Sequence, residues 1–160
     1  MEDILNKEPV KRVQKKLSEF SNELKAIVLN SSARTAKQAA ESLNTEVGSI
    51  VKSLLFKTED GFVLCLVSGD KRCSLNKLKK IKNQRNISMA NADEVKEVTG
   101  FTIGGVSPVA HTQLLEIFID EELNRFNYIF AAAGHPNCIF KINFDNLKKI
   151  TKGLIKNITE

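Results

Sequence analysis

The segment GFTIGGVSP, residues 100–108, concentrates backbone freedom next to a proline. It holds three of the chain's eight glycines and one of its three prolines. Gly104 and Gly105 permit positive φ and let a ligand approach the main chain, whereas Pro108 fixes its own φ and removes one amide donor. Such a G-x-x-x-P loop can hold successive N–H groups around a carbonyl or hydroxyl oxygen. A simple connection between two strands has the same composition, so both interpretations stay open here.

A lysine occupies an apolar position of the segment SIVKSLLFK, residues 49–57. Because side chains alternate across a strand, Lys52 shares one face with Ile50, Leu54 and Phe56. A lysine among large apolar neighbours extends its ammonium group to an edge, binds an anion, or loses its proton through desolvation. The residue pattern alone leaves these three outcomes open.

The histidines and cysteines form no recognisable catalytic or metal-binding constellation. His111 and His135 have no Asp or Cys partner at a spacing typical of catalysis, and the proximity of Ser107 to His111 does not make a serine triad. His135 follows three alanines in AAAGHPN, so it either lines a pocket or lies in an exposed turn. The three cysteines form no CxxC pair, and we therefore expect no metal site and no disulfide.

A run of basic residues between 71 and 85 contains no acidic residue. In SLNKLKKIKN, three apolar residues spaced three apart define one helical face and leave the lysines on the other. The run is either a solvated helix face or a surface that attracts a polyanion. The candidate polyanion-binding residues in this run are Lys71, Arg72, Lys77, Lys79, Lys80 and Lys82.

Helical and strand patterns alternate irregularly along the 160 residues, and at least two hairpins are present. Helices are predicted over 9–20, 35–43, 74–83, 91–100 and 145–153, and strands over 24–29, 49–57, 62–69, 114–120, 127–134 and 138–142. This order predicts an α+β fold, with one domain over residues 1–160 and a mixed, mainly antiparallel, curved β-sheet flanked by helices.

The composition is ordinary for a soluble globular protein, with 42% hydrophobic and 27% charged residues and a formal net charge of +5. The N-terminal segment MEDILNKEPV has no apolar run typical of a secretory signal, and no stretch has the roughly 18 apolar residues that span a bilayer. We expect a cytoplasmic protein that has no membrane partner.

Taken in order, several segments resemble the aminoacyl-tRNA deacylase superfamily, which includes the YbaK/EbsC proteins and the editing insertion of bacterial prolyl-tRNA synthetase. These segments are TAKQAAESL, IVKSLLF, LVSGDKRCSLNKL, GFTIGGVSP, IDEEL and AAAGHPNCIFKI. They extend over roughly residues 35–153. None of them is diagnostic alone, whereas the whole set in this order is strong evidence.

The resemblance implies a trans-editing enzyme that hydrolyses the ester between a small mischarged amino acid and tRNA, in most family members proline tRNA. It implies neither a cofactor nor a metal. Its partners would be the acceptor end of the mischarged tRNA and a prolyl-tRNA synthetase. The family's essential lysine corresponds to Lys52. The family's glycine loop corresponds to Gly104–Pro108, with Gly105 and Ser107 inside it.

The same resemblance suggests where the amino-acid pocket lies. The AAAGHPN turn would bound it, and Phe56 would close it from the strand of Lys52. The candidate substrate-binding residues are Phe56, Val106, His111, Gly134 and His135. The segment NCIFKI is apolar where the cysteine-specific branch has an acidic residue, so cysteine specificity is not assigned.

Two other functions stay open at this point. One is a non-catalytic module of the same fold that binds tRNA or a synthetase. The other is a hydrolase of small esters or thioesters, for which no nucleophile constellation is visible. A deacylation assay distinguishes the enzyme from the binding module, because only the enzyme releases the amino acid.

Overall fold

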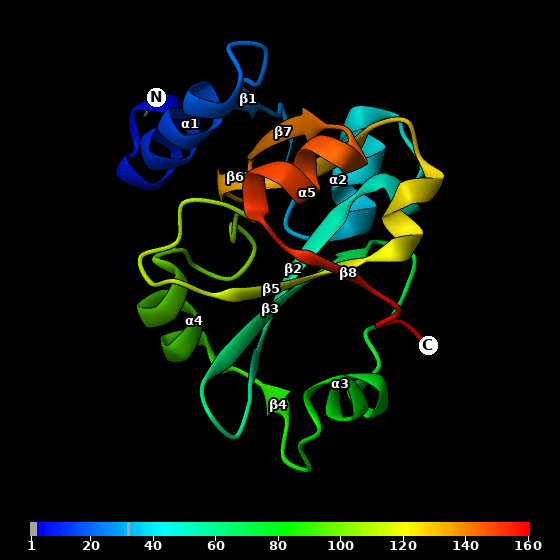
Figure 1. Cartoon of the computed structure of the whole chain (residues 1–160). Helices are drawn as coiled ribbons and strands as arrows, with labels where there is room; N and C mark the ends of the chain where they lie inside the picture. The colour runs from blue at the N-terminus through cyan, green and yellow to red at the C-terminus, as the bar shows by residue number, and fades with distance from the viewer. Residues whose placement is uncertain (1–2, 32) are drawn as a thin grey trace.

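The computed structural model describes residues 3–31 and 33–160, whose strands form two sheets (Figure 1). The smaller sheet has the strand order β1–β7–β6 and consists of β1 (Ile27–Val28), β7 (Cys138–Ile142) and β6 (Ile129–His135). The larger sheet has the order β4–β2–β3–β5–β8. It consists of β4 (Ser88–Met89), β2 (Val51–Lys57), β3 (Phe62–Ser68), β5 (Glu116–Asp120) and β8 (Leu154–Lys156).

The α-helices are α1 (Glu8–Phe20), α2 (Ala36–Leu43), α3 (Leu75–Lys82), α4 (Ala92–Thr99) and α5 (Phe144–Thr151). Helices α2–α5 begin where a side chain satisfies one of the first free amides, at Thr35, Ser74, Asn91 and Asn143, whereas α1 begins with Pro9 in its first turn and no side-chain cap. At Asn91 a capping box with Glu94 is present in both directions. Short 3-10 helices are η1 (Ile4–Asn6), η2 (Val47–Ser49) and η3 (Glu121–Arg125).

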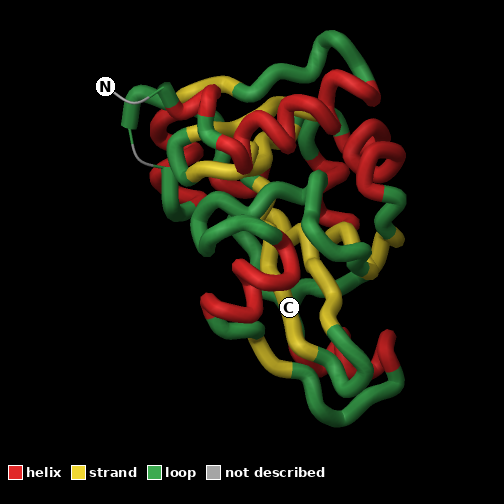
Figure 2. Tube along the Cα trace, turned by 90° about the vertical axis from the view of Figure 1, so that its left-hand side faces the viewer, coloured by secondary structure: helices red, strands yellow, loops and turns green. Residues whose placement is uncertain are grey.

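The small sheet and the long hairpin of β2 and β3 occupy different parts of the molecule. Figures 1 and 2 show α1, α2 and α5 around the small sheet at one end, and α3 and β4 at the opposite end of the hairpin. A bridge between Ile50 and Phe130 joins β2 to the small sheet. This junction lies beside the start of α2, so it brings segments far apart in sequence to one place.

Strand β3 is buried on both faces and divides the interior. Leu64 and Leu66 pack into the main core with α1, α4 and α5, whereas Val63, Cys65 and Val67 pack into a second core with Leu78 of α3. Alternation along the strand therefore sends successive side chains to different cores. The near-continuous apolar sequence of β3 follows from this double burial.

The α+β class and the mixed sheet arrangement are confirmed, and several details of the prediction need correction. The strand expected over 24–29 is reduced to Ile27–Val28. In the helix expected over 9–20, Val10, Val13 and Leu17 form the buried face, and the last residue, Phe20, is 38% exposed. His135 ends β6 and does not begin the turn. Strands β4 and β8 were not predicted, because two or three residues carry too little periodicity to be recognised. Strand β5 pairs in parallel with both β3 and β8.

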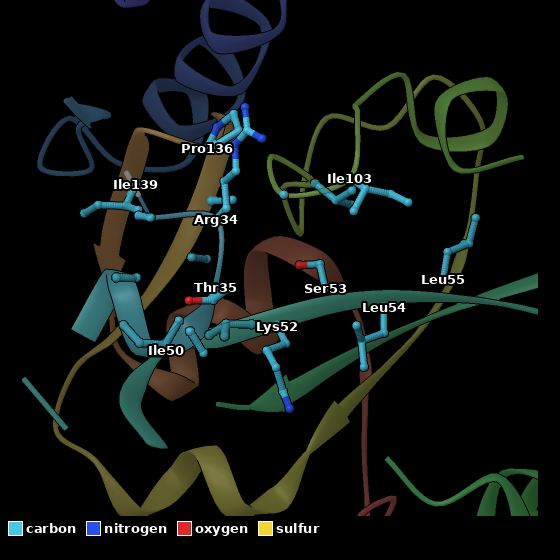
Figure 3. Close-up of a pocket in the computed structure, with 18 of the residues that line it drawn as sticks. Arg34, Thr35, Ile50, Lys52, Ser53, Leu54, Leu55, Ile103, Pro136 and Ile139 are labelled. Atoms are coloured by element: carbon cyan, nitrogen blue, oxygen red, sulfur yellow. The ribbon is translucent and has the colours of Figure 1, made fainter. Parts of the chain in front are cut away.

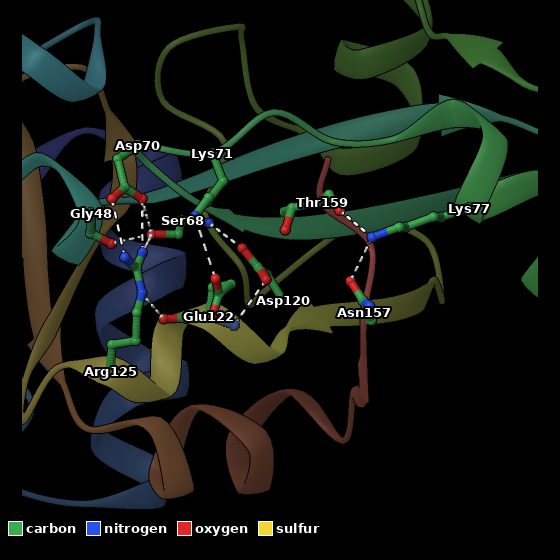
Figure 4. Close-up of polar contacts among 10 residues, drawn as sticks. All are labelled: Gly48, Ser68, Asp70, Lys71, Lys77, Asp120, Glu122, Arg125, Asn157 and Thr159. Atoms are coloured by element: carbon green, nitrogen blue, oxygen red, sulfur yellow. Dashed lines mark hydrogen bonds and ion pairs between the residues drawn. The ribbon is translucent and has the colours of Figure 1, made fainter.

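A buried carboxylate joins β3, β5 and the helix that follows β5 (Figure 4). Asp120 is fully buried, and its two oxygens accept the N–H groups of Ser68 (3.0 Å) and Glu122 (2.9 Å). Nearby, Arg125 donates to both oxygens of Asp70 (2.8 and 3.2 Å) and to the Ser68 hydroxyl. The paired guanidinium holds the pKa of Asp70 below its usual value. These contacts fix the segment after β3, which carries Lys71.

Substitution of Gly134 tests the close packing of α1 on β6. Gly134 has φ +93°, and a Cβ atom there would lie 2.8 Å from the Pro9 carbonyl oxygen. Gly104 has a similar φ of +94°, but a Cβ atom there would meet only ordinary contacts, the nearest at 3.6 Å. We expect Gly104→Ala to cost about 1 kcal/mol from backbone strain alone, and Gly134→Ala to cost at least twice that in urea unfolding. Equal losses would show that α1 does not pack this tightly.

Candidate functional site

A cavity of about 360 Å³ opens where β2, α2, the glycine loop and the turn between β6 and β7 meet (Figure 3). Its volume is within the range of small-molecule sites. Most of its wall is apolar. The buried apolar residues of the wall are Ala39, Ile50, Val51, Leu55, Ala90, Val95, Val106, Ala131 and Ile139.

The mouth of the cavity combines one cation with exposed apolar side chains. Arg34 and Pro136 lie on one side of it and Ile103 on another, all across the cavity from β2 in Figure 3. Ile103 and Met89 are 62% and 59% exposed. Gly104 lies next to the side of the mouth formed by Pro136 and Arg34. A Cβ atom at Gly104 would be 3.6 Å from Pro136 and 3.9 Å from the stem of Arg34. A flat apolar ligand with a nearby negative charge would fit this mouth.

Neighbouring residues of β2 point in opposite directions at the cavity floor. In Figure 3 the Ser53 hydroxyl lies on the same side of β2 as Ile103, Arg34 and Pro136, and the Lys52 ammonium extends to the other side. Lys52 donates a hydrogen bond to the Lys71 carbonyl oxygen. Lys52 is nevertheless one of the residues that line the cavity. The structure therefore places part of Lys52 at the cavity and its charge outside it.

The half-buried position of Lys52 disfavours its charged form. Desolvation lowers the pKa of the Lys52 ammonium below its ordinary value, and electrostatic interactions with Cys73, Asp70 and Asp120 partly offset this effect. Of the three outcomes that the sequence left open, the structure shows an ammonium group that reaches past its apolar neighbours to a backbone carbonyl.

The glycine loop is partly at the cavity and partly buried behind it. Gly104 and Val106 line the cavity, whereas Gly105, Ser107 and Pro108 do not. The Gly105 amide donates to the Thr102 carbonyl (3.0 Å). The amides of Gly104 and Val106 donate to no acceptor within residues 3–31 and 33–160. Both loop residues that line the cavity therefore have an amide that a ligand can still use.

His111 holds the loop from behind. Its Nε2–H donates to the Ser107 carbonyl oxygen (2.7 Å), which fixes the tautomer because a carbonyl can only accept. Its ring lies edge-on to Phe101, with centroids 6.1 Å apart, and Arg12 lies over the same Phe101 ring. His111 does not line the cavity. Burial lowers its pKa below the ordinary value.

The remaining predicted pocket residues lie beside the cavity without lining it. The Nδ1 atom of His135 accepts the Asn137 amide (3.0 Å), and Gly134 packs against the start of α1. The backbone of both residues also contacts Gly105 closely. Phe56 is 3% exposed and packs in the second core on the opposite face of β2. The cavity is bounded at this turn by Pro136 instead.

Helix α3, with Lys77, Lys79, Lys80 and Lys82, lies at the far end of the hairpin from the small sheet (Figure 1), whereas Lys71 and Arg72 follow the end of β3 that pairs with the start of β2. Several of these basic residues are already paired. Lys71 pairs with Glu122 (3.4 Å), Lys82 with Glu116 (2.6 Å), and Lys77 donates to Asn157 and Thr159 (Figure 4). Of the six candidate polyanion-binding residues, Arg72, Lys79 and Lys80 have neither an ion pair nor a side-chain hydrogen bond within the described part of the chain.

Comparison with known proteins identifies the family of this chain. Residues 30–150 match the model of the aminoacyl-tRNA editing domain, which covers the cavity and the loop. The chain belongs to the aminoacyl-tRNA editing domain family. No group of three or more His, Cys, Asp or Glu residues that could hold a metal, and no helix able to cross a membrane, is found in the described parts of this editing domain.

The relatives include both separate proteins and parts of synthetases. A solved structure described as a proposed trans-editing enzyme for prolyl tRNA synthetase is 38% identical, with a TM-score of 0.91 over 96% of this chain and 98% of its own. YwhH of Bacillus subtilis, an uncharacterized protein, is 29% identical over 89% of this chain and 90% of its own. A proline–tRNA ligase of Thermosipho africanus is 44% identical over 51% of this chain, which spans 15% of the ligase.

Three residues of the editing domain's cavity were not singled out from the sequence. Ser53 interrupts the apolar face of Val51 and Leu55, which was a visible signal. Arg34 directly precedes the cap of α2, and Ile103 directly precedes the two glycines. Their positions at one mouth depend on tertiary contacts that local spacing does not encode.

The lowered pKa of His111 predicts a pH-dependent stability. Between the folded pKa and the ordinary value of 6.5, the unfolded chain binds more protons than the folded one. The free energy of unfolding should therefore fall as pH decreases below 6.5. His111→Gln keeps a side-chain N–H donor for Ser107 and should remove this component. The same pH dependence in both proteins, measured by urea unfolding, would show that His111 does not titrate in this way.

Proposed function

We propose that this editing domain is a deacylase that hydrolyses the ester of a mischarged amino acid on tRNA. The observation that carries the proposal is the apolar cavity at the glycine loop, within the segment that matches the family. A tRNA acceptor end terminates in an adenosine that carries the aminoacyl ester. The cavity is large enough for the aminoacyl group, and the exposed apolar mouth can contact the adenine ring.

The reaction would depend on positioning and polarisation. None of the three cysteines lines the cavity, and neither histidine does. An ester is already activated, and the 2′-hydroxyl of the terminal adenosine can assist a water molecule. In our proposal the amides of Gly104 and Val106 bind the ester carbonyl and stabilise the negative charge that develops on its oxygen. Their fixed geometry supplies orientation before the reaction begins.

Lys52 is the proposed cation of the site, and its contact with substrate requires a rearrangement. On the edge of β2 away from β3, Phe130 bridges Ile50, the Ala90 amide donates to Leu55, and β4 pairs with Phe56 and Lys57, so within the described residues no strand pairs with this edge beside Lys52. The flexible stem can pass around this edge when the ammonium group leaves the Lys71 carbonyl. A phosphate at the mouth would compete for the ammonium group, because an ionic partner binds more strongly than a neutral carbonyl.

The finer assignments of the proposal follow the family. The substrate would be a small amino acid on proline tRNA, and a prolyl-tRNA synthetase would be the partner that generates it. Translation places the reaction in the cytoplasm. Arg34 would receive the acceptor end at the mouth. Arg72, Lys79 and Lys80 would attract the tRNA at longer range.

Substitution of Lys52 tests the proposed activity. On a panel of mischarged tRNAs, wild type should release at least one amino acid, and Lys52→Ala should lower that rate by about tenfold or more, because it removes the proposed cation. Lys57→Ala is the matched control. It removes a lysine from the same strand, where Lys57 is exposed and pairs with Glu94 (3.3 Å).

Three results are informative in this assay. Loss of activity in Lys52→Ala alone supports the assignment. Equal rates in all three proteins would contradict the role of Lys52 but retain the deacylase. Binding of mischarged tRNA without release of any amino acid by wild type would instead establish the non-catalytic module.

A further inference from the structure

The floor of the cavity holds a polar atom that has no partner. Within residues 3–31 and 33–160, Ser53 Oγ is the one buried side-chain nitrogen or oxygen without a hydrogen bond. It lies in the wall of the cavity, between the buried side chains of Val51 and Leu55 on the same face of β2. A buried hydroxyl without a partner costs about 1–3 kcal/mol. Such a cost is removed when a ligand supplies the missing partner.

The position of Ser53 differs from that of the other polar groups of the cavity. The Thr35 hydroxyl accepts the Gln38 amide at the start of α2, and the Lys52 ammonium is on the far side of β2. Arg34 is at the exposed mouth. Ser53 is therefore the polar side chain that a group at the cavity floor would meet first.

We propose that the Ser53 hydroxyl accepts a hydrogen bond from the α-amino group of the bound aminoacyl ester. This inference rests on the proposed function. In that proposal the ester carbonyl is bound by the amides of Gly104 and Val106, so the α-amino group is the polar group common to all aminoacyl esters that still needs a partner. The apolar wall favours the neutral amine, which retains N–H donors. Ser53 thus recognises the aminoacyl group in general and not one side chain.

Two stable analogues separate this contact from the rest of binding. In 3′-deoxy-3′-(alanylamino)adenosine an amide replaces the ester, and 3′-deoxy-3′-(propionylamino)adenosine differs from it only by lacking the α-amino group. Wild type should bind the alanyl analogue about three- to tenfold more tightly, the range expected for one neutral hydrogen bond. In Ser53→Ala this difference should disappear. Ser53→Thr retains the hydroxyl and should retain the difference.

Folding stability gives a second, independent readout. Removal of an unpartnered buried hydroxyl should leave the Tm of Ser53→Ala unchanged or raise it, whereas removal of a hydroxyl with a structural hydrogen bond should lower it. The proposal is overturned if Ser53→Ala still discriminates between the analogues, if wild type does not discriminate, or if the Tm falls. Hydrolysis of mischarged tRNA by wild type, measured in parallel, tests the proposed function separately. A deacylase whose wild-type form ignores the α-amino group would retain that function and lose only the Ser53 contact.

Discussion

The alternation of side chains along β2 is the constraint on which the site depends. One face of the strand contributes Val51, Ser53 and Leu55 to the cavity side, and the other sends Phe56 into the core beneath α3. A shift of register by one residue would exchange these two sets. The pairing of Val51 with Ser68 and of Lys57 with Phe62 fixes the register along the full length of the hairpin.

The surroundings of β2 keep the two faces chemically different. On the α3 side, buried Asp120 and the Asp70–Arg125 pair hold the segment that presents the Lys71 carbonyl to Lys52. On the cavity side, His111 and Arg12 hold the glycine loop by bonds to the carbonyl oxygens of Ser107 and Ala110. The buried carboxylate of Asp120, the Asp70–Arg125 pair and the Lys52 ammonium thus lie on the α3 side of β2, and most of the cavity wall stays apolar. An apolar cavity strengthens each of the few polar contacts that a ligand can make there.

Local signals predicted the elements better than the site. The capping box of Asn91 and Glu94, the turn at Gly61 and the amphipathic faces of α1 and α3 depend on neighbours within a few residues, and the elements they predict are present. The parallel pairing of β5 with β3 and β8 depends on contacts distant in sequence, and it was not foreseen. The resemblance assigned the glycine loop and Lys52 to the site, and the structure places Gly104, Val106 and Lys52 among the residues that line the cavity. The resemblance could not show that the Lys52 ammonium lies on the α3 side of β2. The carbonyl oxygen that accepts its hydrogen bond belongs to Lys71, which follows β3, and this contact depends on the tertiary fold.

The Lys52 ammonium and the cavity lie on opposite sides of β2, and we therefore propose that substrate binds on the Ser53 face, between the glycine loop and Arg34. A crystal structure with 3′-deoxy-3′-(alanylamino)adenosine is the direct test of this binding mode. We expect the alanyl group at the cavity floor, with its carbonyl oxygen within hydrogen-bond distance of the Gly104 or Val106 amide and the adenosine at the mouth beside Ile103. An analogue bound on the α3 side of β2, with the cavity empty, would contradict this binding mode.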